Sequence, residues 1–224
     1  HTVIFDGSLL VNGTSEGNIS YKRYLSTDNW YLVSSPVMGQ DIDTFVSAEG
    51  LASGTNNNNM GLASYDNTSA AWSYHQSDAS VSGDFALGSG RSIKLAAAGD
   101  ISFTGTMPVE NVSIAITSNT NGYNLVGNPY PSHISINDII NTNTASLTEG
   151  TLWIWDNYKG GYYATFNLAT PTSYISPAQG FFVKSNGTNS LSITEAMQSH
   201  QSDSFLRLSS ERPEISLVLS DGEI

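Results

Sequence analysis

The chain has 224 residues, enough for one large β domain or two small ones, and 39% of them are hydrophobic, enough to form a core. Its net charge is −12, from 20 acidic against 8 basic residues, which opposes binding to nucleic acid or to an anionic membrane surface. The lack of cysteine excludes disulfides and thiolate metal sites. No apolar run approaches the length of a membrane span, so we expect no membrane insertion.

Short strands joined by polar turns are the elements that this composition favours, because only 12% of the residues are charged and Gly, Ser, Thr and Asn are abundant. In chain order, alternating or β-branched segments predict strands at residues 19–25, 30–36, 60–66, 70–76, 91–97, 100–107, 112–118, 123–129, 151–157, 161–167, 180–186 and 191–197. Helical turns are favoured only at residues 41–46 and 134–140, where Ser135 is a candidate N-cap of the second.

One sequence pattern occurs twice along the chain. Five blocks recur in the same order, two at an offset of 93 and three at an offset of 90: 18–21 with 111–114, 30–36 with 123–129, 63–66 with 153–156, 90–94 with 180–184, and 101–107 with 191–197. Chance matches would not keep this order, so we interpret them as an internal duplication. The predicted fold is therefore all-β, with two tandem antiparallel β-sandwich-like repeats of about 90 residues.

The repeats are placed at residues 18–108 and 109–198. Residues 1–17 are expected to end a preceding module, and residues 199–224 to start a following β module or to add an edge strand. We thus expect neighbouring domains in a longer chain. A single merged sandwich is the alternative, because neither repeat needs to bury its sheet face alone.

The segment "YNLVGNPYPSHI", residues 123–134, ends a predicted strand with two prolines. Pro129 and Pro131 cannot donate to a sheet, and each forces the preceding residue into extended geometry. The segment therefore predicts a rigid exit from a strand. A sugar-binding loop that uses Asn128 and Tyr130 is the less favoured interpretation, since turn residues shape the chain by default.

Three segments of the second repeat together resemble a module of large secreted and cell-surface proteins of Bacteroidota, which are often exported by the type IX secretion system. They read Gly-Asn-Pro-Tyr-Pro at residues 127–131, Trp-Asp at 155–156 with Gly-Tyr at 161–162, and Pro-Ala-Gln-Gly-Phe-Phe-Val at 177–183. The similarity is weaker in the first repeat, where Ser-Ser-Pro replaces Gly-Asn-Pro at residues 34–36. The resemblance implies a secreted or outer-surface location and supplies no catalytic residues.

Residues that carry enzymatic chemistry form no recognisable pattern. The four histidines, His1, His75, His133 and His200, lack metal-ligand spacing, and no G-x-S-x-G motif occurs. We therefore predict that the chain is not an enzyme and has no catalytic residues.

Acidic residues offer two weaker signals. Asp41 and Asp43 would face the same side of an extended chain, which makes them weak candidates for Ca²⁺ binding or for glycosidase carboxylates, although solvated turn residues are the stronger interpretation. Asp66 and Asp156 occupy equivalent strand ends and are expected to cap turns. No other cofactor is predicted.

Aromatic residues give the sharper signal for binding. Trp153 and Trp155 alternate with apolar residues and share one strand face, and Tyr158, Tyr162 and Tyr163 follow in the same predicted hairpin. These five residues form the candidate ligand surface, and neutral glycans suit it because exposed rings stack on sugars. At least one of the two tryptophans is expected in the core, whereas Tyr158 and Tyr162 are the candidates for exposure.

The equivalent hairpin of the first repeat carries Tyr65, Trp72 and Tyr74, and has Ala63 in place of Trp153. Residues 181–183 are expected to be core, because consecutive apolar residues suit a strand buried on both faces.

Three functions are compatible with these features. The first is a non-catalytic spacer or adhesion module that contacts glycans or other cell-surface components. The second is a carbohydrate-binding module of a polysaccharide-degrading enzyme, and the third, least favoured, is a hydrolase. A cleft lined by exposed rings would distinguish the second function from the first.

Overall fold

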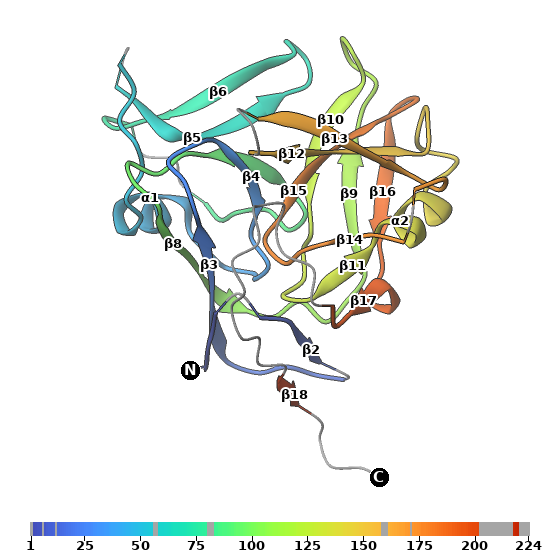
Figure 1. The fold of residues 1–224 in the computed structure, drawn as a ribbon, viewed down its shortest axis with the longest axis horizontal. Helices are drawn as coiled ribbons and strands as arrows, with labels where there is room; N and C mark the ends of the chain where they lie inside the picture. The colour runs from blue at the N-terminus through green and yellow to red at the C-terminus, as the bar shows by residue number, and fades with distance from the viewer. Residues whose placement is uncertain are drawn as a thin grey trace.

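The computed structural model describes residues 2–5, 7–11, 13–55, 58–79, 83–157, 161–170, 172–201 and 217–219. The predicted all-β fold is confirmed: several mostly antiparallel sheets fill these ranges, together with two α-helices of one to two turns (Figure 1). Within these ranges, no helix has both the length and the apolar character that crossing a membrane requires.

Two four-stranded antiparallel sheets are the largest sheets in the described part of the chain. Sheet I has the order β4-β7-β5-β6, with bounds Tyr31–Ser34, Gly90–Ile93, Asn59–Asp66 and Ala71–Gln76. Sheet II has the order β10-β15-β12-β13, with bounds Tyr123–Gly127, Gly180–Lys184, Thr151–Asp156 and Tyr162–Asn167. The two sheets have the same strand order. The aligned sequence blocks that form these strands occupy the same position in the order of each sheet.

The remaining strands flank these sheets. Two antiparallel pairs also correspond between the two halves of the chain, β3 with β8 and β9 with β16, at Asn18–Leu25, Gly99–Thr106, Val112–Ile116 and Asn189–Ile193. In the second half, β11 (His133–Ser135) lies between β14 (Tyr174–Ile175) and β17 (Gln198–Ser199). Near the ends of the chain, β1 (Thr2–Phe5) runs parallel to β3, and β2 (Leu9–Val11) runs parallel to β18 (Leu217–Leu219).

Both predicted helical turns are present and lie at opposite flanks of the molecule (Figure 1). Helix α1 spans Ile42–Ala48 and α2 spans Ile136–Thr142, close to the predicted bounds. Ser135 caps α2 as predicted, because its Oγ accepts a hydrogen bond of 3.2 Å from the backbone N–H of Asp138. A single 3₁₀ turn, η2 (Glu195–Met197), follows β16.

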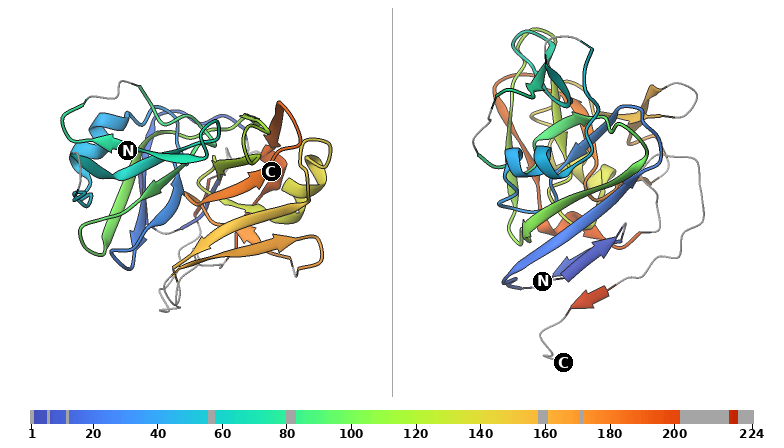
Figure 2. Two further views of the ribbon diagram at one scale, coloured as in Figure 1. Left: turned by 90° about the horizontal axis from the view of Figure 1, so that it is seen from above. Right: turned by 90° about the vertical axis from the view of Figure 1, so that its left-hand side faces the viewer.

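Each half of the chain has its own hydrophobic core. The first core gathers buried side chains between Leu9 and Met107, and the second gathers those between Ile116 and Met197. Seen from above, the blue-to-teal elements of the first half lie beside the yellow-to-orange elements of the second (Figure 2). One residue breaks this division: Ala178, from the second half, packs into the first core.

The two halves join where their backbones cross, and the contacts there are reciprocal. The N–H of Ser34 donates to the carbonyl of Ala178 at 3.1 Å, and the N–H of Gly127 donates to the carbonyl of Gly88 at 2.8 Å. Ser34 aligns with Gly127 at the offset of 93, and Gly88 aligns with Ala178 at the offset of 90. The same contact is therefore made twice, once by each half, and we call this region the backbone crossing.

Aligned glycines allow the close approach at the backbone crossing. A Cβ atom at Gly90 would lie 2.6 Å from the carbonyl oxygen of Val126, and one at Gly180 would lie 3.0 Å from the backbone of Val33. Val33 and Val126 also align at the offset of 93. Each half thus presents a glycine to the same strand position of the other half.

We predict that Gly90→Ala and Gly180→Ala each lower the free energy of unfolding by about 1–3 kcal/mol, because the added methyl group overpacks the backbone crossing. Urea denaturation followed by tryptophan fluorescence measures this loss. Gly99→Ala is the matched control, since a Cβ atom there meets its nearest neighbour, in Leu95, at an ordinary 3.7 Å. A loss in the control as large as in the two variants would contradict the prediction.

Candidate functional site

The candidate tryptophans lie on the face of sheet II that turns toward sheet I. Along β12, Leu152 and Ile154 are buried in the second core, while Trp153 and Trp155 are half-buried on the opposite face. Successive side chains of a strand point to opposite faces, so this burial pattern follows from the predicted alternation. Neither tryptophan belongs to the second core, contrary to the expectation that at least one of them would.

An aromatic slot of about 240 Å³ lies between the two sheets. Sheet I contributes two of its lining residues and sheet II contributes four: Tyr65, Trp72, Tyr123, Trp153, Tyr163 and Phe182. Phe182 is buried, with 6% of its surface exposed, whereas Tyr163 is 42% exposed. The slot therefore has a closed floor and accessible rings above it.

Phe182 is the residue around which the other rings gather. The ring centroids of Tyr65, Trp72, Tyr123 and Tyr163 lie 5.1, 6.2, 6.4 and 5.7 Å from the Phe182 centroid, at interplanar angles of 79–89°. Edge-to-face pairs of this kind are each favourable by about 0.5–1.5 kcal/mol beyond the area they bury. The rings thus hold one another in place without a ligand.

The predicted ligand residues divide between the two faces of sheet II. Trp153 and Tyr163 line the slot, and Trp155 packs edge-on against Tyr163 at 5.0 Å. Tyr162 is 49% exposed but lies on the opposite face of β13, because it neighbours Tyr163 along the strand. Tyr158 lies outside the described residues.

Four slot residues were outside the predicted ligand surface: Tyr65, Trp72, Tyr123 and Phe182. Residues 181–183 are all buried, as expected, but only Phe181 and Val183 belong to the second core, while Phe182 turns to the slot. Strand alternation could have indicated this side for Phe182. The contribution of Tyr65 and Trp72 could not be foreseen, because it depends on sheet I packing against sheet II.

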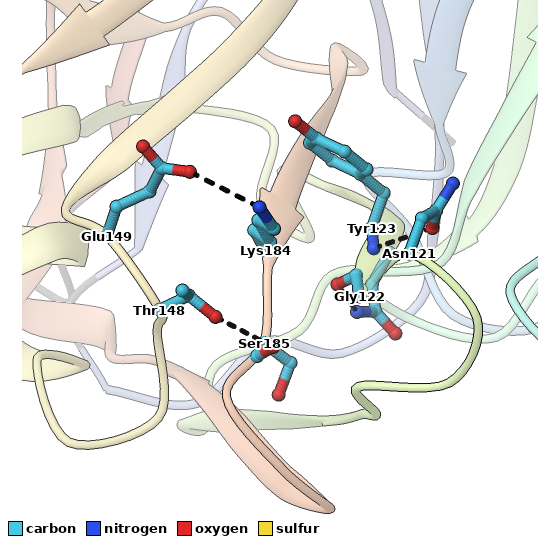
Figure 3. A network of polar contacts seen from close by, with 8 residues as sticks. Asn121, Gly122, Tyr123, Thr148, Glu149, Lys184 and Ser185 are labelled. Atoms are coloured by element: carbon cyan, nitrogen blue, oxygen red, sulfur yellow. Dashed lines mark hydrogen bonds and ion pairs between the residues drawn. The ribbon is translucent and has the colours of Figure 1, made fainter.

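Tyr123 lines the slot, and the polar groups of Asn121, Glu149 and Lys184 lie near it (Figure 3). The ammonium of Lys184 lies 5.5 Å from the Tyr123 ring centroid and 3.8 Å from a carboxylate oxygen of Glu149. Asn121 accepts a hydrogen bond of 3.1 Å from the Tyr123 N–H. Such an ion pair adds little stability at a surface, so these groups remain available to a ligand at small cost.

Asparagine side chains also connect this region to sheet I. Asn121 donates a hydrogen bond of 2.9 Å to the Tyr65 hydroxyl, and Asn67 donates one of 2.6 Å to the Tyr123 carbonyl. The two bonds join opposite walls of the slot. The pKa of Tyr163 is raised, mainly by burial and to a smaller extent by the nearby Tyr65. Its hydroxyl therefore stays protonated at neutral pH and can donate a hydrogen bond.

Asn128 and Tyr130, in the segment between β10 and β11, are fully buried. Asn128 donates to the carbonyls of Ser132 and Ser176 at 2.7 and 3.1 Å and accepts from the Tyr130 N–H at 2.9 Å. Burial raises the pKa of Tyr130 to about 12. These contacts agree with a shaped corner and leave no surface for the sugar-binding alternative.

The candidate carboxylates act on the backbone. Asp41 caps α1, accepting a hydrogen bond of 2.7 Å from the Thr44 N–H, and this bond lowers the pKa of Asp41. Asp43 lies inside the first turn of α1, so the two side chains do not share one face of an extended chain as expected. Asp66 accepts from the Thr68 N–H at 2.8 Å, as predicted for a turn cap.

No group of three or more histidine, aspartate or glutamate side chains in the described part of the chain is placed to hold a metal ion. Among the histidines, His133 is buried and His75 is half-buried on β6. His200 lies 3.1 Å from the hydroxyl of Ser8, measured from Nδ1. His1 lies outside the described residues.

Comparison with known proteins gives no relative: no family model matches the chain, and no curated protein or solved structure matches it. The site is therefore interpreted from its own geometry.

We predict that Asn128→Ala lowers the free energy of unfolding by about 2 kcal/mol or more, because it leaves several buried backbone groups without a partner. Thermal or urea unfolding measures the loss. Asn186→Ala, which removes an exposed asparagine that donates to the Ala145 carbonyl at 2.9 Å, is the control and should change stability by about 0.5 kcal/mol or less. Equal losses in both variants would show that Asn128 has no special structural role.

Proposed function

We propose that the chain is a non-catalytic β module that binds a neutral glycan chain in the aromatic slot. The observation that supports this proposal is the slot itself: six rings from two sheets surround an accessible hollow with polar groups at its rim. This is the feature that separates a carbohydrate-binding module from a simple spacer.

Stacking explains why the slot suits sugars. The C–H faces of a pyranose ring pack on aromatic faces, and rigid rings lose little conformational entropy when a ligand binds. Here the edge-to-face contacts with Phe182 already hold the rings in position, so binding requires little further ordering. The amide of Asn121 and the ammonium of Lys184 are suited to hydrogen bonds with sugar hydroxyls at the rim.

Size and charge narrow the class of ligand. A hollow of about 240 Å³ is slightly smaller than typical small-ligand pockets, so it suits one or two units of a glycan that continues across the surface. The net charge of −12 opposes sulfated or uronic polymers. Neutral polysaccharides of plants or algae are therefore the favoured ligands.

The cellular setting follows from the sequence resemblance to secreted Bacteroidota modules. Under this proposal the module works outside the cell or on its outer surface, within a longer chain that leaves by type IX secretion. It would attach a neighbouring catalytic domain, or the cell itself, to a polysaccharide.

A spacer function is the second candidate, and the backbone crossing supports it. The reciprocal hydrogen bonds and the glycine contacts at Gly90 and Gly180 join the two halves closely, as a stiff connecting piece requires. Such a piece would need no ligand. The two candidates differ in whether the rings of the slot bind anything.

We predict that the double variant Trp72→Ala/Tyr163→Ala weakens retention on a neutral polysaccharide by roughly tenfold or more, since each ring contributes about 1 kcal/mol by analogy with aromatic pairs. Affinity gel electrophoresis against a panel of neutral plant and algal polysaccharides measures retention. A glycan array run beforehand selects the ligand for the quantitative comparison.

Tyr162→Ala is the matched control for this experiment, because Tyr162 is an exposed tyrosine on the same strand but on the other face. It should retain the affinity of the unchanged protein, and urea unfolding should show that every variant is folded. Equal affinity of the double variant and the unchanged protein would show that the polysaccharide does not bind in the slot. Absence of retention on every polysaccharide would leave the spacer function.

A further inference from the structure

A second hollow, of about 190 Å³, lies on the other side of sheet I, and the arginine that lines it forms no ion pair with any of the described carboxylates. Its lining includes the side chain of Arg91 on β7, together with Ser64, Ser73 and His75 on β5 and β6. Strand register places these side chains on one face, because Ser64 pairs with Ser73, His75 lies two positions after Ser73, and Arg91 precedes Ser92, the partner of Ala63.

The side chain of Arg91 is half-buried, and its Nε atom is inaccessible to solvent and has no hydrogen-bond partner in the described part of the chain. Its Cζ atom lies 5.9 Å from the centroid of the Phe85 ring. Burial alone lowers the pKa of Arg91, with no contribution from a neighbouring carboxylate.

An unpaired buried cation is costly in free energy, so proteins normally supply it with an anion. This chain has 20 acidic residues against 8 basic ones, yet none of the described carboxylates forms an ion pair with Arg91. The two hydroxyls of Ser64 and Ser73 are further donors on the same face. The hollow therefore combines hydrogen-bond donors with a positive charge, and none of the residues that line it is a carboxylate.

We propose that this hollow binds the carboxylate group of a small organic acid, with Arg91 as the principal donor. The planar guanidinium matches a carboxylate through two parallel hydrogen bonds. Apolar side chains of Ile42 and Leu62 line the rest of the hollow, which suits a short aliphatic body better than a fully hydrated phosphate. This site is independent of the aromatic slot and of the glycan proposal.

The test is a titration of the intact chain with sodium acetate, sodium butyrate and inorganic phosphate at constant ionic strength, followed by heteronuclear NMR. We expect saturable shifts of the Arg91 Nε–H signal and of the amides of Ser64, Ser73 and His75 with both carboxylates. Butyrate should bind more tightly than acetate, by roughly two- to fourfold for each additional methylene group, because each methylene buries apolar surface.

Two variants complete the experiment. Arg91→Met should abolish the saturable shifts at Ser64 and Ser73 while the protein stays folded, since Met can fill the space beside Phe85. Lys94→Gln removes one positive charge three residues along the chain, at a residue that lines a different hollow, and should leave the titration unchanged.

The proposal is overturned if neither carboxylate produces saturable shifts, if Arg91→Met titrates like the unchanged protein, or if phosphate saturates the site and the carboxylates do not. Should Arg91→Met fail to fold, the direct Nε–H titration of the unchanged protein decides between the outcomes.

Discussion

The close approach of two backbones at Gly90 and Gly180 is the constraint on which the rest of the structure depends. A side chain at either position would collide with the strand opposite, at Val126 or Val33, so the two sheets can meet this closely only through glycine. Beside them, Ala178 keeps a φ of +58°, a conformation that costs a non-glycine residue about 1–2 kcal/mol, where its counterpart Gly88 has a φ of +73°. Ala178 keeps this conformation while its carbonyl accepts a hydrogen bond from the Ser34 N–H and its methyl group packs into the core of the other half.

The aromatic slot is a consequence of this crossing. Gly180, Phe182 and Lys184 follow one another on the same face of β15 and lie at the crossing, on the floor of the slot and at its rim respectively. On β10, Gly127 lies at the crossing and Tyr123 in the wall of the slot. The glycines thus set how far apart the two sheets are, and the large rings two to four residues away occupy the space that this separation leaves.

Local features were predictable from the sequence because each depends on neighbouring residues only. The alternation along β12, the two short helices and the Ser135 cap are examples, and all three are confirmed. The composition of the slot was not predictable, since Tyr65 and Trp72 reach it only through the packing of two sheets. The expectation that Asp41 and Asp43 face the same side of an extended chain is wrong, because Asp41 caps α1. Its carboxylate accepts a hydrogen bond from the backbone N–H of Thr44, which the helix itself leaves without a partner. The site at Arg91 was not predictable from the sequence, because a single arginine in a strand is common. That no described carboxylate pairs with it becomes visible only in the folded structure.

Differences between corresponding positions explain why sheet II contributes more of the rings in the slot than sheet I does. Where sheet II has Trp153 and Phe182, sheet I has Ala63 and Ser92 at the aligned positions. The two sheets have the same strand order, and Ala63 pairs with Ser92 as Trp153 pairs with Phe182, so these exchanges change the side chains that project between the sheets. Large residues on both sheets would overpack the interface, and small residues on both would leave a void. Large rings on sheet II therefore occur where sheet I has smaller residues on β5 and β7, while Tyr65 and Trp72, at the hairpin end of β5 and β6, supply the second wall of the slot. The same sheet turns Arg91 to its other face, so a ligand at one face need not disturb the other.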